Sequence, residues 1–183
     1  TLMRSSAASD VYKRQLQDGR DLMSLALLDR DNPFQRVVAW NNLAKKQDVA
    51  TWKMLQQKWP QSAAILDMGF SDKGNVDLES VLSRQPDLMI AQLRAKPALT
   101  ESGVIGKLTA LKIPVLFVDY EVNPSRDTAP SIDLLGQVLN RESNAKAYTD
   151  FYRRHLHAIE QQTATITPKA CLLYTSPSPR DCS

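Results

Sequence analysis

The sequence predicts an α/β fold, with a mainly parallel sheet and flanking helices followed by a long helix. Two observations support this prediction. Helical and strand-like segments alternate over residues 16–127, and the strand-like segments are apolar throughout, as in sheets covered on both faces. From residue 128 the pattern changes to an apolar stripe with spacings of three and four residues, which predicts a long amphipathic helix.

Four short apolar segments predict buried strands, and the segments between them have helical spacing. The predicted strands are 36–40, 63–68, 87–93 and 114–119. The predicted helices between and before them are 22–28, 49–59, 77–84 and 102–111. Pro130 suits the first turn of the long helix, and Asn140 to Glu142 could loosen it.

The composition is that of an ordinary globular protein. The 183 residues carry a formal net charge of +3, with 43% hydrophobic and 23% charged residues. These values exclude a disordered charged tail, a collagen-like fibre and a disulfide-dense miniprotein. The small net charge argues against a nucleic-acid partner, which usually selects a strongly basic face.

The two ends differ from the middle. The segments DVYKRQ and CLLYTS can be encoded by DNA strands that are reverse complements, as in translated sequencing adapters of the tagmentation type. We therefore set aside residues 1–15 and 171–183 as adapter-like segments. The remainder divides into an N-terminal lobe (16–127), a long interlobe helix (128–163) and the start of a missing second lobe (164–170).

The candidate binding loops follow the predicted strands. In parallel α/β sheets the ligand lies beyond the carboxyl ends of the strands. The loops that satisfy this condition are 41–46, 69–75, 93–100 and 120–127.

Familiar enzyme and metal motifs are absent from the sequence. The segment from Gly103 to Lys107 partly matches a phosphate-binding loop, but Glu101 replaces its first glycine and Leu108 its hydroxyl residue. His155 and His157 are the only histidines, and two residues apart on a helix they diverge. We expect no metal site and no catalytic residues.

Several residues of the candidate loops have side chains suited to binding. Trp40 ends a strand and could stack on a ligand or cap the core. Phe70, Ser71 and Lys73 could hold an anion or form a solvated turn. Arg94 follows the next strand at the same edge and adds positive charge.

The ordered motifs of residues 75–119 resemble the periplasmic binding proteins that serve iron–siderophore and cobalamin importers. A short helix and strand read N-V-D-L-E-S-V-L-S-R-Q-P-D-L-M-I, and a later strand reads L-K-I-P-V-L-F-V-D. Lys112 stands where the family usually has glycine. The opening D-G-R-D-L and R-V-V-A-W also resemble the iron-chelate subgroup, and S-I-D-L-L-G-Q-V-L-N-R-E-S-N-A resembles the start of the family's long helix.

This resemblance implies two α/β lobes joined by one long helix, with the ligand held between them. The chain would supply the first lobe and the helix. Lys73 or Ser71 occupies a region where relatives often hold arginine, which has a planar fork that lysine lacks. By position, the implied ligand-binding residues are Trp40, Asn41, Ser71, Lys73 and Arg94, with Phe70 from the same loop and Arg20 as a further anion-binding candidate.

The resemblance also implies the partners of the protein. A Glu on each lobe of these proteins docks onto Arg residues of the membrane permease, and Glu79 holds that position here. A carboxylate in the first turn of a helix is also favoured by the helix dipole, which is the alternative role of Glu79. We expect a monomer, located in the periplasm or anchored to lipid outside the cytoplasm.

We therefore expect a substrate-binding component of an ABC importer, which captures a ferric siderophore or similar iron chelate. The resemblance implies no resident cofactor, since iron enters only as part of the ligand. An enzyme domain acting on a phosphorylated or nucleotide ligand is the alternative, and it would require phosphate-binding glycines or an acid–base pair. A receptor for a free metal is a third possibility, which the scarcity of histidines disfavours.

Overall fold

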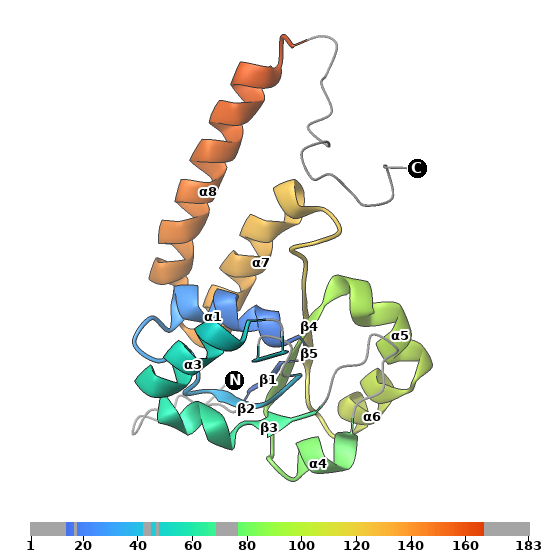
Figure 1. Cartoon of the computed structure of the whole chain (residues 1–183). Helices are drawn as coiled ribbons and strands as arrows, with labels where there is room; N and C mark the ends of the chain where they lie inside the picture. The colour runs from blue at the N-terminus through green and yellow to red at the C-terminus, as the bar shows by residue number, and fades with distance from the viewer. Residues whose placement is uncertain (1–13, 17, 42–44, 47, 69–76, 167–183) are drawn as a thin grey trace, which may run out of the picture.

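The structure, a computed structural model, contains a five-stranded parallel sheet that confirms the predicted fold class (Figure 1). It describes residues 14–16, 18–41, 45–46, 48–68 and 77–166. The strand order is β3-β2-β1-β4-β5, and each neighbouring pair is parallel. The strands are β1 (Arg14–Leu16), β2 (Val37–Trp40), β3 (Leu66–Asp67), β4 (Leu88–Gln92) and β5 (Val115–Val118).

Helices cover both faces of this sheet. The α-helices are α1 (Leu22–Leu28), α3 (Val49–Lys58), α4 (Leu78–Leu82), α5 (Lys96–Glu101), α6 (Val104–Ala110), α7 (Pro124–Leu139) and α8 (Glu142–Thr163). The 3₁₀ helices are η1 (Gly19–Asp21), η2 (Pro60–Ala64) and η3 (Leu93–Ala95). In Figure 1, α1, α3 and α7 lie on one side of the sheet, and α5 and α6 on the other.

Alternation along the strands divides the core into two clusters. On β4, Leu88 and Ile90 pack with residues of α1, α3, α7 and α8, whereas Met89 and Ala91 pack with α5 and α6. Successive side chains of a strand point to opposite faces, so a strand buried on both faces must be apolar throughout. This explains why the apolar segments predicted the parallel sheet.

The central strand lies partly in residues that the sequence analysis set aside. Arg14, Gln15 and Leu16 pair with β2 on one side and with β4 on the other. The exclusion of residues 1–15 therefore removed the strand that joins the two halves of the sheet. A three-residue strand is too short to be detected by its periodicity.

Two prolines explain further differences from the predicted elements. Pro60 begins η2, so the strand expected over 63–68 shortens to Leu66–Asp67. Pro97 lies in the first turn of α5, which occupies part of the expected loop 93–100.

The long helix expected over 128–163 consists of two helices. Asn140 ends α7 with φ of 54°, a left-handed conformation that terminates helices. Pro124 begins α7, so Pro130 lies inside that helix. Gly136 faces the Ala145 Cβ so closely that no side chain fits between α7 and α8. The far half of α8 extends beyond the other labelled helices and strands (Figure 1), and residues 157–166 are all exposed.

Within the described part of the chain, the helices are too short or too polar to cross a membrane.

Candidate functional site

The candidate site lies where the chain reverses its direction of winding across the sheet. From β1 the chain passes to β2 and β3 on one side, and then to β4 and β5 on the other. The connections leaving the carboxyl ends of β1 and β4 diverge at such a point and leave a crevice. Asp18 to Asp21 follow β1, Gln92 ends β4, and Glu121 lies beyond β5.

A tight turn after β1 positions the first residues of the site. The Asp18 Oδ1 accepts a hydrogen bond of 2.9 Å from the Arg20 backbone N–H. The Gly19 N–H donates to the Asn41 Oδ1 at 2.6 Å, and a Cβ on Gly19 would collide with the Asn41 carbonyl. Glycine at position 19 therefore allows the turn to lie directly against the end of β2.

Two arginines and two carboxylates form a closed ionic network at this edge. Asp18 Oδ2 lies 2.6 Å from Arg20 Nη2 and 3.1 Å from Arg94 Nη2. The Glu121 carboxylate lies 3.0 Å from Arg20 Nη2 and 2.6 Å from Arg94 Nε. The two guanidinium groups are thus held side by side by two shared carboxylates.

The two carboxylates differ in their surroundings. Burial of Asp18 would raise the pKa of its carboxyl, but hydrogen bonds from Arg20 and the charges of both arginines outweigh this effect and lower that pKa. Asp18 is therefore a fixed, ionised anchor. The Glu121 side chain is 38% exposed and lies on the loop after β5. Another anion can therefore replace Glu121 on the arginines at little cost, whereas separating Asp18 from them would leave a buried charge unpaired.

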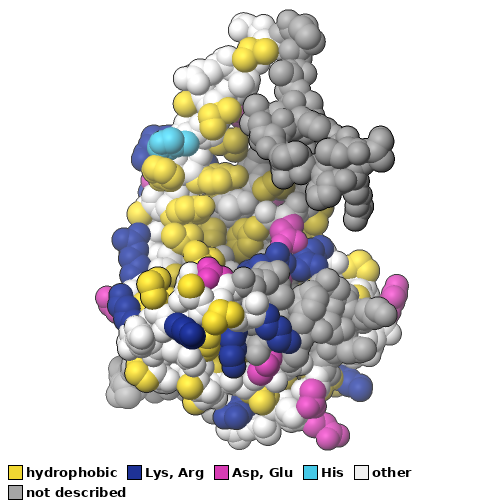
Figure 2. Space-filling view, viewed as in Figure 1, with side chains coloured by type: hydrophobic (Ala, Val, Ile, Leu, Met, Phe, Trp, Pro, Cys, Tyr) yellow, Lys and Arg dark blue, Asp and Glu magenta, His cyan; other side chains and the backbone are white. Residues whose placement is uncertain are grey.

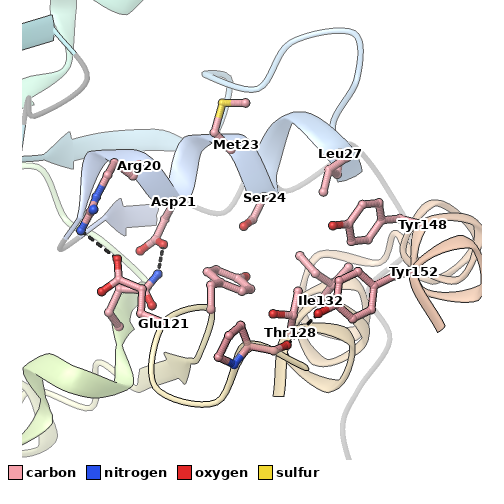
Figure 3. A pocket seen from close by; sticks show the side chains of 13 residues that line it. Arg20, Asp21, Met23, Ser24, Leu27, Glu121, Thr128, Ile132, Tyr148 and Tyr152 are labelled. Carbon is pink, nitrogen blue, oxygen red and sulfur yellow. Dashed lines mark hydrogen bonds and ion pairs between the residues drawn. The ribbon is translucent and has the colours of Figure 1, made fainter. Parts of the chain in front are cut away.

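A cavity of about 480 Å³ opens beside the network (Figure 3). Its walls come from η1, α1, α7, α8 and the ends of β4 and β5. In Figure 2, hydrophobic side chains gather over α7 and α8, and most of the charged ones over the part below. The cavity is lined by Arg20, Asp21, Met23, Ser24, Leu27, Gln92, Tyr120, Glu121, Pro124, Thr128, Ile132, Tyr148 and Tyr152.

A buried polar pair forms one wall of the cavity. Asp21 is 2% exposed and Gln92 is 4% exposed, and the Gln92 Nε2 donates a hydrogen bond to the Asp21 Oδ1. Burial, with the nearby charge of Asp18, raises the pKa of Asp21 to about 8. Two neighbouring carboxyls thus differ at neutral pH, since Asp18 is ionised and Asp21 is mainly protonated.

Among the predicted site residues that the structure describes, Arg20 and Arg94 are the two that it brings together. Trp40 is 2% exposed and packs in the core against Phe34 and Trp52, so its ring does not reach the site. Asn41 is also buried, and its side chain supports the Gly19 turn. Both residues were expected at the binding surface, but the segments around residues 34 and 52 cover the end of β2.

The other predicted residues lie elsewhere. Phe70, Ser71 and Lys73 fall outside the described residues. Glu79 is exposed in the first turn of α4, where Asp77 caps the helix by accepting a hydrogen bond from the Ser80 N–H. This position is compatible with either role expected for Glu79.

Sequence reasoning missed four residues of the site: Asp18, Asp21, Gln92 and Glu121. Asp18 and Asp21 belong to the D-G-R-D-L segment that carries part of the family resemblance, and only Arg20 of that segment was a binding candidate. Gln92 ends an apolar strand, and a lone polar residue at a strand end was the signal available there. Glu121 lies in a loop that was selected, but no feature distinguished it from the other polar residues of that loop.

Within the described residues, no group of three or more His, Cys, Asp or Glu side chains is arranged to hold a metal ion.

Comparison with known families supports the resemblance seen in the sequence. A family model described as "Periplasmic binding protein" matches residues 33–182. The chain belongs to this family. The match covers most of the chain and extends into the segment 171–183 that the sequence analysis set aside. No curated protein matches the sequence.

Solved structures of periplasmic binding proteins share the fold. The TroA-like protein FepB from Veillonella parvula matches with a TM-score of 0.77 and 17% identity, covering 89% of this chain and 48% of that protein. MolA from Haemophilus influenzae, bound to molybdate, matches with a TM-score of 0.62 and 14% identity, covering 88% of this chain and 52% of MolA. The heme-binding protein BhuT, in complex with two hemes, matches with a TM-score of 0.56 and 18% identity. This match covers 85% of this chain and 52% of BhuT.

The chain therefore spans about half the length of these periplasmic binding proteins. The family and these neighbours are solute-binding proteins rather than enzymes.

Proposed function

We propose that this chain is the first lobe and interlobe helix of the substrate-binding component of an ABC importer. Its ligand is an anionic ferric siderophore or similar iron chelate, captured between two lobes and delivered to a membrane permease. The Arg20 and Arg94 pair at the strand ends is the observation that supports this proposal. Family membership supports the transport role, and the neighbour BauB, bound to acinetobactin and ferric iron, supports the class of ligand.

The arginine pair is suited to recognise an anion by exchange. Guanidinium groups donate parallel hydrogen bonds to carboxylates and similar planar oxyanions. Glu121 occupies this position on both arginines, from an exposed loop. We infer that an oxyanion of the ligand replaces the Glu121 carboxylate, while Asp18 keeps both arginines in place.

Capture requires a second lobe, since one lobe forms only one wall of the site. The chain covers 48% of FepB and 52% of MolA, which leaves room for a lobe of similar size in the complete protein. Closure of the second lobe over the ligand would exclude water and strengthen the contacts of the arginines.

Glu79 is proposed to dock the lobe onto the permease. It is exposed on a short helix, and an exposed charge mainly steers docking and sets its register. The expected location is the periplasm, or the outer face of the membrane through a lipid anchor. The receptor is proposed to act as a monomer, without catalysis or a resident cofactor.

The proposal is tested by titrating the protein with ferric hydroxamate, ferric catecholate, ferric citrate, haem and cobalamin in a calorimeter. We expect saturable binding of an anionic iron chelate, without chemical change of the recovered ligand. Arg94→Gln should weaken that binding at least tenfold, whereas Arg30→Gln, the same change at an exposed site, should leave it unchanged. Binding unaffected by Arg94→Gln, or turnover of a phosphorylated compound, would contradict the proposal.

A further inference from the structure

The cavity beside the arginine pair has a second recognition feature, which an anion alone would not use. Three residues that line it, Asp21, Gln92 and Tyr120, each have a buried polar atom (Oδ2, Oε1 and Oη) without a hydrogen-bond partner among the described residues. Buried polar atoms are almost always paired, so three exceptions on residues of one cavity, two of them on the hydrogen-bonded neighbours Asp21 and Gln92, indicate the place of a ligand group.

The opposite walls of the cavity are apolar and aromatic. Leu27 comes from α1, Ile132 from α7, and Tyr148 and Tyr152 from α8 (Figure 3). The Tyr152 hydroxyl donates to the Pro124 carbonyl at 2.8 Å, which fixes the orientation of that ring. The cavity thus combines a polar end next to Asp21 with a fixed apolar end, a combination typical of small-molecule sites.

We propose that this cavity binds an uncharged arm of the ligand, a ring or short apolar chain that carries an amide or hydroxyl group. The amide or hydroxyl would pair with Asp21 Oδ2 and Gln92 Oε1, and the ring would lie against Ile132 and the two tyrosines. This assignment rests on the proposed function, because it describes a second part of the same ligand whose anionic part binds Arg20 and Arg94.

The charges around Asp21 favour a neutral group over a charged one. Asp18 and Glu121 disfavour a second negative charge, and Arg20 disfavours a positive one, so the region is already neutralised. A protonated Asp21 donates from its free oxygen, while Gln92 Oε1 accepts. The cavity wall also contains the hydroxyl groups of Ser24, Tyr120, Thr128, Tyr148 and Tyr152.

Four ring compounds of similar size test the assignment: benzamide, toluene, benzoate and benzamidine. Their binding to the 183-residue chain is followed by NMR titration at pH 7. We expect benzamide to bind with a dissociation constant in the millimolar range, and each other compound at least fivefold more weakly. Tightest binding of benzamidine would instead assign a cation site. Toluene binding equal to benzamide, or no binding at all, would also overturn the assignment.

Variants of the polar wall separate recognition from folding. Asp21→Leu removes the polar atoms at similar size and should weaken benzamide binding at least fivefold, as should Gln92→Met if the first variant does not fold. Asp21→Asn keeps a donor and an acceptor and should retain binding within twofold. Asp31→Asn, the same change at an exposed aspartate, should have no effect. Unchanged binding in both Asp21→Leu and Gln92→Met would overturn the assignment.

The outcome is distinguishable from failure of the proposed function. Arg94→Gln should weaken chelate binding at least tenfold without changing benzamide binding, since Arg94 does not line the cavity. If benzamide binds as expected but no chelate does, the proposed function fails and the chemistry of the cavity stands.

Discussion

Two strand ends at the same edge of the sheet have opposite characters. At the end of β2, Trp40 is sealed into the core, with its ring 5.9 Å from Phe34 and 5.3 Å from Trp52 between centroids. At the ends of β1 and β4, Arg20 and Arg94 lie in an ionic network beside a cavity. An aromatic residue at a strand end is therefore not by itself a binding residue.

The difference arises from topology. The segment around Phe34 and helix α3 cover the end of β2 with apolar side chains, so Trp40 gains more from packing than from exposure. The connections after β1 and β4 diverge, and polar residues fill the crevice between them.

The largest expected effect is on stability, at the sealed strand end. Trp40→Ala should lower the free energy of unfolding by about 3–5 kcal/mol, because it removes a large buried side chain and leaves a cavity. Chemical denaturation measures this loss. Trp59→Ala, at a partly exposed ring of the same cluster, should cost less. Equal losses for the two variants would contradict the sealed character of the β2 end.

The next largest loss of stability is expected at the contact between the two regions, where Gly19 lies against Asn41. Gly19→Ala should destabilise the protein by about 1–3 kcal/mol, because the new Cβ collides with the Asn41 carbonyl. Gly106→Ala is the control, because a Cβ there meets no atom within 4 Å inside α6, and it should stabilise by about 0.5–1 kcal/mol. Thermal unfolding compares them, and a tolerated Gly19→Ala would show that the turn does not need this approach.

The pH dependence of stability is the third test. Because burial raises the pKa of Asp21, this group stabilises the fold fully below about pH 3.8, and its contribution is lost as the pH rises through about 8. Asp21→Asn cannot ionise and should lack this loss. The free energy of unfolding, measured from about pH 4 to about pH 8, should fall more steeply in the unchanged protein.

The size of this difference has a lower bound. Each pKa unit corresponds to about 1.4 kcal/mol, so the two curves should diverge by more than that amount across the range. The lowered pKa of Asp18 acts at lower pH and does not interfere. Parallel curves for the two proteins would show that Asp21 is ionised throughout.

The smallest expected effect is at Arg20. Arg20 Nε lies 3.1 Å from Asp18 Oδ1, and Nη2 lies 2.6 Å from Asp18 Oδ2. Arg20→Lys should lose this forked contact but keep the charge, at a cost below about 1 kcal/mol, because the side chain is 44% exposed. Urea denaturation measures it, and a loss of several kcal/mol would contradict an exposed role for Arg20.

Much of the fold followed from the apolar pattern, whereas the site followed only in part. Strands such as β4 were predictable because burial on both faces makes them continuously apolar. Strand β1 was not predictable, because three residues carry no periodic signal. The break at Asn140 was not predictable either, because its left-handed conformation depends on packing between α7 and α8. Arg94 was predictable because it follows a predicted parallel strand, and the loops after such strands meet at one edge. Arg20 was a candidate only through the family resemblance, because the strand before it was not predicted. Their partners Asp18 and Glu121 were not, because pairing at that edge depends on the strand order.

We propose that Glu121 occupies the place of the ligand anion on Arg20 and Arg94. The most direct measurement is calorimetric titration of ferric citrate into the unchanged protein, Glu121→Gln and Glu101→Gln. Glu121→Gln removes the competing charge and should tighten binding about fivefold, which corresponds to about 1 kcal/mol. Glu101→Gln, at an exposed residue of α5, should leave binding unchanged. Weaker binding in Glu121→Gln would contradict the claim, because Glu121 would then support the ligand rather than compete with it.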